Sequence, residues 1–148
     1  MILPYAFSSI VFPLSILVTI NFWAIYSYYP RVIDEDNVTE SFFPSWVNHG
    51  LHTTILLLAC IEKFITYRSY PTKIQGFLGL STVLTLYCLT CTILYLIGGV
   101  WPYPLVSLLS KWHLLIYIYG NYLFGFFIMR LGESINNKIW SKNLFLNT

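Results

Sequence analysis

Charged residues are scarce in this 148-residue chain. They make up 9% of the sequence, whereas 57% of the residues are hydrophobic. An ordinary soluble domain has about a quarter charged residues. The net charge is only +2 and the basic residues stand singly, so no nucleic-acid-binding surface is predicted. We therefore expect an all-α fold, a multi-pass transmembrane helical bundle that forms one integral membrane domain over residues 1–148.

Cysteine is also rare. The three cysteines, Cys60, Cys88 and Cys91, lie in apolar runs and are odd in number, so no disulfide framework is predicted. Cys88 and Cys91 form a C-x-x-C pair, but no second pair of ligands stands nearby to complete a zinc site. We interpret them as small residues that pack between helices, and we expect no cofactor.

Long apolar runs are what the sequence has in abundance. A membrane-spanning helix takes about 20 residues. Four runs of sufficient length predict four spanning helices, at about 8–29, 46–67, 75–97 and 107–130, followed by a tail over 131–148.

Positive charge is unevenly divided between the two sides of this predicted domain. One side carries six cations, Lys63, Arg68, Lys73, Arg130, Lys138 and Lys142, and the other carries Arg31 and Lys111. Because cytoplasmic loops collect Lys and Arg, both termini and the 131–148 tail are predicted to be cytosolic. The membrane would be the endoplasmic reticulum, another endomembrane or the plasma membrane. On the opposite face, Asn37-Val38-Thr39 makes Asn37 a candidate glycosylation site.

Two histidines lie in the run Asn48-His49-Gly50-Leu51-His52, at the start of the second predicted span. A titratable group in a membrane is costly, and proteins that keep one use it as a proton carrier, a ligand or a buried hydrogen-bond partner. His52 follows Trp46 by six residues, which is about 9 Å along a helix. This run is the strongest indication of function in the sequence.

Helical geometry limits the partners of His52. Asn48 and His49 precede it by four and three residues and share its face, whereas Thr53 points about 100° away. If His52 is a general base, the hydroxyl that it activates should come from another helix. The hydroxyls that we considered within the chain are those of Thr19, Thr90 and Ser107.

Other interpretations of the polar run stay open. A polar group in a membrane helix is often a packing hydrogen bond, and Asn21 and Asn121 lie deeper, where they would extend a polar patch. His49, His52 and His113 enter from the same side and would be the ligands of a metal or haem, although histidine-box oxygenases need more than three. A non-catalytic membrane protein, acting as a packing or interaction partner, is the remaining alternative.

The segment 42–54, Phe-Phe-Pro-Ser-Trp-Val-Asn-His-Gly-Leu-His-Thr-Thr, resembles the androgen-induced gene family of membrane proteins. The likeness extends upstream to residues 12–14 and 22–26 and downstream to residues 101–104 and 131–140, so it covers nearly the whole chain. The resemblance implies a six-helix membrane protein that hydrolyses fatty acid esters of hydroxy fatty acids with a threonine nucleophile and a histidine.

Mapped by motif, the catalytic histidine of the family is His52. Our own inference gives Asn48 or His49 the supporting role of orienting its imidazole. The threonine lies on the second helix of the family, and this chain resembles the family from just before the third. We therefore expect either an N-terminally truncated form that lacks the first two helices or a shortened relative without the chemistry.

The partner that the resemblance implies is a membrane lipid or lipid ester. A second copy of the chain, or partner helices, would cover the face that two missing helices would occupy.

The transcript upstream of Met1 tests the expected truncation. We expect it to encode two further apolar helices with a threonine in the second, because the resemblance places the nucleophile there. Sequencing the full-length transcript from its capped end checks this expectation. If all transcripts begin at Met1, the enzyme interpretation of this chain is to be dropped.

Overall fold

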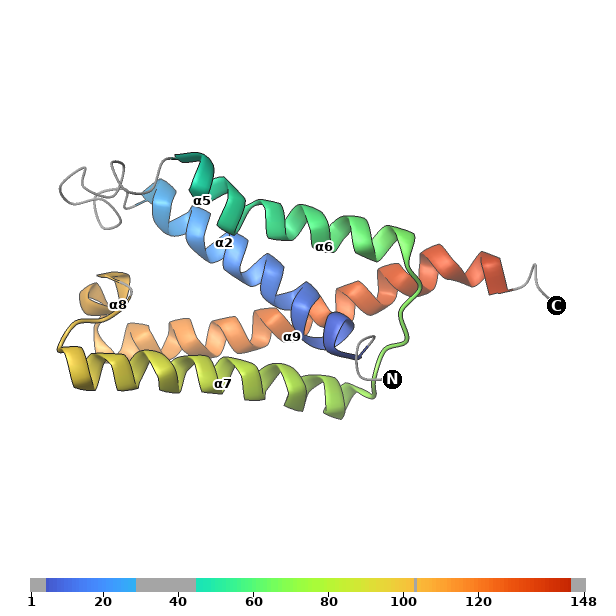
Figure 1. Ribbon diagram of the computed structural model, residues 1–148. Helices are drawn as coiled ribbons and strands as arrows, with labels where there is room; N and C mark the ends of the chain where they lie inside the picture. The colour runs from blue at the N-terminus through green and yellow to red at the C-terminus, as the bar shows by residue number, and fades with distance from the viewer. Residues whose placement is uncertain (1–4, 29–44, 103, 145–148) are drawn as a thin grey trace.

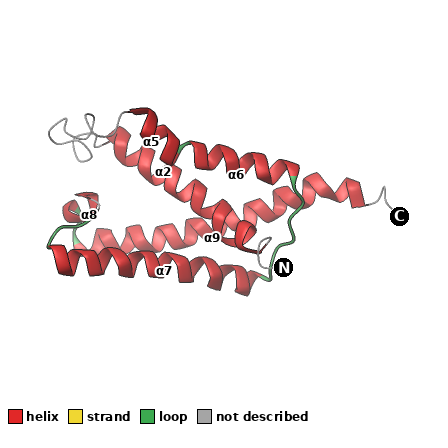
Figure 2. Cartoon of the chain, in the orientation of Figure 1, coloured by secondary structure: helices red, strands yellow, loops and turns green. Residues whose placement is uncertain are grey.

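Every element of the computed structural model is a helix within the residues that it describes, which are 5–28, 45–102 and 104–144 (Figure 2). The all-α expectation is confirmed for these residues. Asn37, the candidate glycosylation site, lies outside them.

The first long helix consists of a π-helical turn, η1 (Phe7–Val11), and α2 (Phe12–Tyr28). Pro13 is the second residue after the π turn. A proline within a helix has no N–H for the carbonyl four residues earlier, and its ring crowds that carbonyl. In the wider turn, the Phe12 N–H donates to the Phe7 carbonyl. This local change accommodates Pro13, and the helix continues beyond it.

The second apolar run differs from its prediction. In place of one helix at about 46–67, the structure has α5 (Ser45–His52) and α6 (Thr54–Ile65), interrupted at Thr53. The Thr53 hydroxyl accepts a hydrogen bond from the Trp23 indole of α2. Side-chain hydrogen bonds of this kind compete with the helical backbone. Hydropathy does not reveal the break, because its partner comes from another helix.

The third run forms α7 (Lys73–Gly98), close to the predicted 75–97. It begins at a capping box, in which Thr72 and Gln75 each bond the backbone of the other. It ends at Gly99, whose φ of 70° lies in the left-handed region that favours glycine.

The fourth run extends further than predicted. The short α8 (Pro104–Leu108) precedes α9 (Lys111–Leu144), which runs through most of the segment expected as a tail over 131–148. Buried residues recur every three or four positions in α9, and the pattern continues past Arg130 at Gly132 and Asn136. The inner face of α9 therefore keeps packing after its hydropathy falls.

Three helical segments of the described residues are long and apolar enough to cross a membrane: Phe7–Tyr28, Lys73–Gly98 and Lys111–Ser141. The chain thus has the helices of a multi-pass membrane protein. α5 has 8 residues and α6 has 12, so neither is long enough to span alone. The four uninterrupted spans expected from the sequence are therefore three in the structure.

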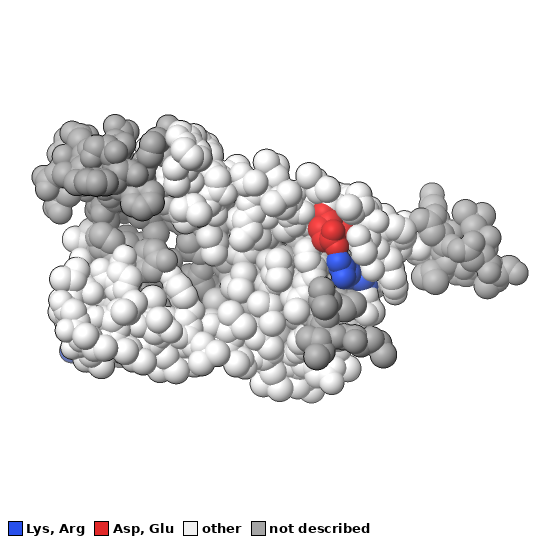
Figure 3. All heavy atoms as spheres, in the orientation of Figure 1, with Lys and Arg blue, Asp and Glu red and all other residues white. Residues whose placement is uncertain are grey.

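α2 lies at the centre of the fold (Figure 1). It packs against α9 and against α5 and α6, while α7 packs against η1 and α9. Phe12, Leu17, Ala59 and Ile128 form a small core between these helices. Most of α7 is exposed. The face in Figure 3 is nearly uncharged, apart from a group of acidic and basic atoms near the C-terminal end of α6.

Gly132 lets α9 approach its neighbours closely. A Cβ at Gly132 would lie 2.8 Å from the Tyr70 hydroxyl and 2.9 Å from the Cε1 atom of Phe12, so either neighbour would have to shift. A Cβ on Gly120 of the same helix would meet nothing within 4 Å. Alanine substitutions at these two glycines therefore distinguish the effect of close packing from that of intrinsic helix propensity.

We expect Gly132→Ala to lower the free energy of unfolding by about 1–3 kcal/mol, because the Phe12 ring and Tyr70 must move. Gly120→Ala should leave stability unchanged or raise it by up to about 1 kcal/mol. Thermal unfolding of both purified variants in the same detergent measures the difference. Equal stabilities would show that α9 is not packed this closely at Gly132.

Candidate functional site

Two side chains of α2 hold the interruption between α5 and α6. The Thr19 hydroxyl donates to the Ser15 carbonyl at 2.8 Å and to the His52 carbonyl at 2.6 Å. The His52 carbonyl ends α5, where carbonyls have no helical partner. One turn further along α2, Trp23 Nε1 donates to Thr53 Oγ1 at 3.0 Å. These contacts fix where α5 ends and α6 begins.

The two imidazoles of α5 each lie against an aromatic ring of α2. The His52 ring is parallel to that of Phe22, with centroids 3.7 Å apart and an interplanar angle of 8°. The His49 ring lies over Trp23, with centroids 4.6 Å apart, and its Nδ1 is 3.2 Å from Thr53 Oγ1. Nδ1 of His52 is buried and has no hydrogen-bond partner among the described residues. His49 therefore supports the turn at Thr53, whereas a nitrogen of His52 is left unpaired.

The predicted supporting residues do not hydrogen-bond to His52. Within the described part of the chain, no hydrogen bond joins its imidazole to Asn48 or His49. Asn48 is half-buried and His49 is exposed. The ring that contacts His52 belongs instead to Phe22, which the sequence analysis did not single out. Its role depends on how α2 and α5 are rotated toward each other, and a sequence of apolar residues gives no signal for that rotation.

The three hydroxyls considered as partners of His52 are placed elsewhere. The Thr19 hydroxyl donates to carbonyls, including that of His52 itself. Thr90 donates to the Leu86 carbonyl at 2.9 Å within α7. Ser107 is exposed in α8. None of these hydroxyls hydrogen-bonds to the imidazole within the described residues.

The three histidines are not gathered into a metal site. His113 is exposed at the start of α9, where its Nδ1 lies 2.7 Å from Ser110 Oγ. Among the described residues, no three His, Cys, Asp or Glu side chains are close enough to share a metal ion. His49, His52 and His113 therefore do not form the ligand set that was considered from the sequence.

Asn21 and Asn121 meet between α2 and α9. Nδ2 of Asn21 donates to Oδ1 of Asn121 at 2.7 Å, and the Tyr117 hydroxyl donates to Oδ1 of Asn21 at 2.8 Å. Both amides also donate to carbonyls of their own helices, those of Leu17 and Tyr117. Asn21 and Asn121, which the sequence predicts as a deeper polar patch, thus form a packing contact in which both amides are hydrogen-bonded.

A second polar cluster, the lysine cluster, lies at the opposite end of α6 from His52. Its centre is Lys63, which is 1% exposed and donates to the Tyr70 hydroxyl. The Lys63 Nζ also lies 5.3 Å from the centre of the Phe12 ring. Burial, followed by the nearby Glu133 carboxylate, raises the pKa of the Tyr70 hydroxyl, so this group stays neutral beside the ammonium.

Two ion pairs and a buried asparagine complete the lysine cluster. Glu62 pairs with Arg68, and Arg130 pairs with Glu133. Asn136 accepts from the Arg68 N–H at 3.2 Å and donates to the Arg68 carbonyl at 3.0 Å. These contacts connect α6, the segment after it and α9, although Nε of Arg68 is buried without a partner among the described residues. The ion pairs and hydrogen bonds of the cluster therefore have a structural role, which is to hold these segments together.

Comparison with known proteins identifies relatives along nearly the whole chain. A model of the family described as "FAR-17a/AIG1-like protein" matches residues 1–137. The androgen-induced gene 1 protein of Homo sapiens is 31% identical over 134 residues, which cover 87% of this chain and 54% of that protein. The androgen-dependent TFPI-regulating protein of Homo sapiens is 32% identical over 139 residues, which cover 90% of this chain and 58% of that protein.

The androgen-dependent TFPI-regulating protein of Mesocricetus auratus is similar to the chain at the same level, with 31% identity over 134 residues. The chain spans 54% to 58% of the length of these curated relatives. No solved structure gives a significant match.

Thr53→Val keeps the shape of the side chain and removes the hydroxyl that Trp23 and His49 share. We expect the free energy of unfolding to fall by about 1–3 kcal/mol, because the indole N–H loses its partner. Thr54→Val is the control, since the Thr54 hydroxyl is exposed and reaches only the His49 carbonyl at 3.3 Å. That change should stay within about 0.5 kcal/mol. Denaturant unfolding in detergent measures both, and equal losses would count against the bridging role of Thr53.

Proposed function

This chain belongs to the FAR-17a/AIG1-like protein family, and from that premise we propose that it carries the histidine of a membrane hydrolase. The proposed substrates are fatty acid esters of hydroxy fatty acids, and His52 is the residue that transfers protons. Both the substrate class and the threonine nucleophile come from the resemblance found in the sequence. The chain spans little more than half the length of its relatives. In this proposal the threonine belongs to the part that it does not span.

The observation that carries the proposal is the buried Nδ1 of His52, which has no hydrogen-bond partner within residues 5–28, 45–102 and 104–144. A buried polar atom without a partner costs about 1–3 kcal/mol, so each such atom in a native protein calls for an explanation. Ser9 Oγ, Arg68 Nε and Trp140 Nε1 are also buried without a partner among the described residues, but of these four groups only an imidazole gains and loses a proton near neutral pH. Proton transfer during catalysis is a use that requires an unpaired nitrogen before the substrate arrives.

The stacking of His52 on Phe22 supports the same role. A parallel contact at 3.7 Å covers one face of the imidazole. The two ring nitrogens lie in the plane of the ring, so this contact holds its orientation without occupying them. The Thr19 hydroxyl holds the backbone of the same residue. Ring and backbone are thus both positioned by α2, as a residue in acid–base catalysis needs to be.

The proposed reaction has two steps. First, His52 takes the hydroxyl proton of the threonine as its oxygen attacks the ester carbonyl. The same proton then passes to the leaving oxygen, which releases the hydroxy fatty acid and leaves an acyl-threonine. Second, His52 takes a proton from water as the water oxygen attacks the acyl carbon. The fatty acid leaves, and the proton returns to the threonine oxygen.

We further propose that α5 and α6 together make a fourth membrane crossing. Residues 45–65 would extend over roughly 30 Å at 1.5 Å per residue, close to the thickness of a bilayer core. His52 would then lie in the half of the membrane away from the cytosol, and the lysine cluster on the cytosolic side. This placement agrees with the distribution of Lys and Arg.

We expect His52→Gln to lower kcat/KM by at least about a thousandfold in the full-length form that carries the threonine, because glutamine cannot accept the proton. Labelling by an organophosphonate probe, which reacts with activated hydroxyls, should disappear as well. His113→Gln is the control, because His113 is exposed and lies at the start of α9. Release of free fatty acid from the ester, followed by mass spectrometry, measures the activity.

Unchanged turnover in His52→Gln would show that His52 is not the base. Absence of hydrolysis in the unmodified full-length protein would favour the alternative, a non-catalytic membrane module.

A further inference from the structure

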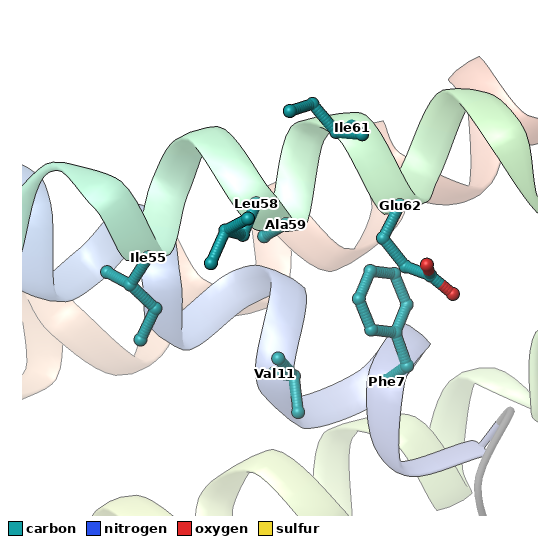
Figure 4. A pocket seen from close by; sticks show the side chains of 7 residues that line it. All are labelled: Phe7, Val11, Ile55, Leu58, Ala59, Ile61 and Glu62. Carbon is teal, nitrogen blue, oxygen red and sulfur yellow. The ribbon is translucent and has the colours of Figure 1, made fainter.

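An apolar hollow of about 350 Å³ lies between the first long helix and α6 (Figure 4). It is open on one side, as a groove is. Its walls are Phe7 and Val11 of η1 and, on α6, residues that include Ile55, Leu58, Ala59 and Glu62. Glu62 is the only charged group among its lining residues. The structural roles of the lysine cluster and of the contacts around Thr53 do not explain why this hollow exists.

The hollow leads toward His52. On α6, the lining residues Glu62, Leu58 and Ile55 follow one another at intervals of four and three, so they share a face. His52 precedes Ile55 by three residues, at the end of α5 and across the interruption at Thr53. On the first long helix, Val11 and Phe22 are eleven residues apart, which is about three turns, so they share a face. Phe22 is the residue that stacks on His52. The first long helix therefore carries residues of both the hollow and the candidate site, and the Ile55 end of the hollow is three residues from His52 in the chain.

The length of the hollow follows from the helix rise. The lining residues of α6 run from Ile55 to Glu62, and seven residues of helix extend over about 10 Å. His52 lies three residues before Ile55, so the distance from His52 to Glu62 is about 15 Å. Ile55 is one turn from His52, Leu58 lies about halfway, and Glu62 lies at the far end.

The far end offers no free charge to a ligand. The Glu62 carboxylate pairs with the Arg68 guanidinium, which also lies 5.1 Å from the centre of the Phe7 ring. A second anion at this end would meet an arginine that is already neutralised and a carboxylate that repels it. The apolar walls and the paired charges at this end therefore suit an uncharged hydrocarbon chain.

We propose that this hollow binds the fatty acyl chain of the ester substrate. The ester group would lie at His52 and the methyl end of the chain would point toward Glu62 and Arg68. This inference rests on the proposed function, which supplies the ester. Because the Glu62–Arg68 ion pair stands at the far end, we expect the hollow to favour acyl chains that end before it. Leu58, halfway along, becomes a residue that determines specificity.

Leu58→Trp tests the proposal, with Leu57→Trp as its matched control. The two leucines are neighbours on α6 and are 61% and 58% exposed, but only Leu58 lines the hollow. In the full-length form, Leu58→Trp should lower kcat/KM for a dodecanoyl ester by about tenfold or more and leave a butanoyl ester unaffected. Leu57→Trp should leave both unchanged. Leu58→Ala, which enlarges the hollow, should not show the loss on the long ester.

Photocrosslinking gives a second readout that does not need turnover. A long-chain ester with a diazirine near its methyl end should label η1 and α6 in unmodified protein, in Leu57→Trp and in His52→Gln. It should fail to label them in Leu58→Trp. Suppose that labelling of η1 and α6 is lost in Leu58→Trp, but neither the unmodified protein nor any variant hydrolyses the ester. The proposed function then fails and the acyl site stands.

If hydrolysis depends on His52 while both tryptophan variants treat long and short esters alike, the acyl site is overturned and the proposed function stands. If Leu58→Trp does not fold, the positions labelled in the unmodified protein test the acyl site instead. Labels that lie outside η1 and α6 would contradict the proposal.

Discussion

The constraint on which this fold depends is that a bilayer offers buried polar groups no hydrogen-bond partners. Polar side chains between the helices find partners in their own helix or in another, and α2 supplies most of these partners around the candidate site. Thr19 and Trp23 bond the end of α5 and the start of α6, while Asn21 bonds α9. Each contact fixes the rotation of one helix against α2. The pairs thus specify an arrangement that apolar packing alone, with its interchangeable leucines and isoleucines, would leave open.

His52 differs from these paired side chains in the hydrogen bonding of its ring. Its backbone carbonyl is bonded by Thr19 and its ring is stacked on Phe22, yet Nδ1 has no partner among the described residues. His49, three residues away, shows the opposite pattern, since its Nδ1 lies beside the Thr53 hydroxyl. The same helix therefore holds one histidine that stabilises a turn and one whose nitrogen is unpaired. Sequence spacing places them on one face and cannot distinguish them.

Hydropathy predicted the apolar helices well where a helix is uninterrupted. Predicted boundaries of 8–29 and 75–97 compare with Phe7–Tyr28 and Lys73–Gly98 in the structure. The hydropathy prediction failed where a side chain from another helix determines whether a helix breaks or continues. The break at Thr53 depends on Trp23, thirty residues earlier in the chain. The continuation of α9 depends on close contacts of Gly132 and on the bonds of Asn136, which a window averaging polarity treats as a departure from the membrane.

The two ends of α6 are related through the helix itself. At one end, Thr53 and Thr19 fix α6 against α2 beside His52. At the other, the lysine cluster ties it to α9 through the bonds of Asn136 to Arg68 and through the burial of Lys63. A rigid helix fixed at both ends keeps a constant separation from η1, and that separation is the width of the apolar hollow. The segment 131–140, which resembles the family, therefore bears on the candidate site without touching it. Through the bonds of Asn136 to Arg68, it holds the end of α6 that carries Glu62, a lining residue of the hollow.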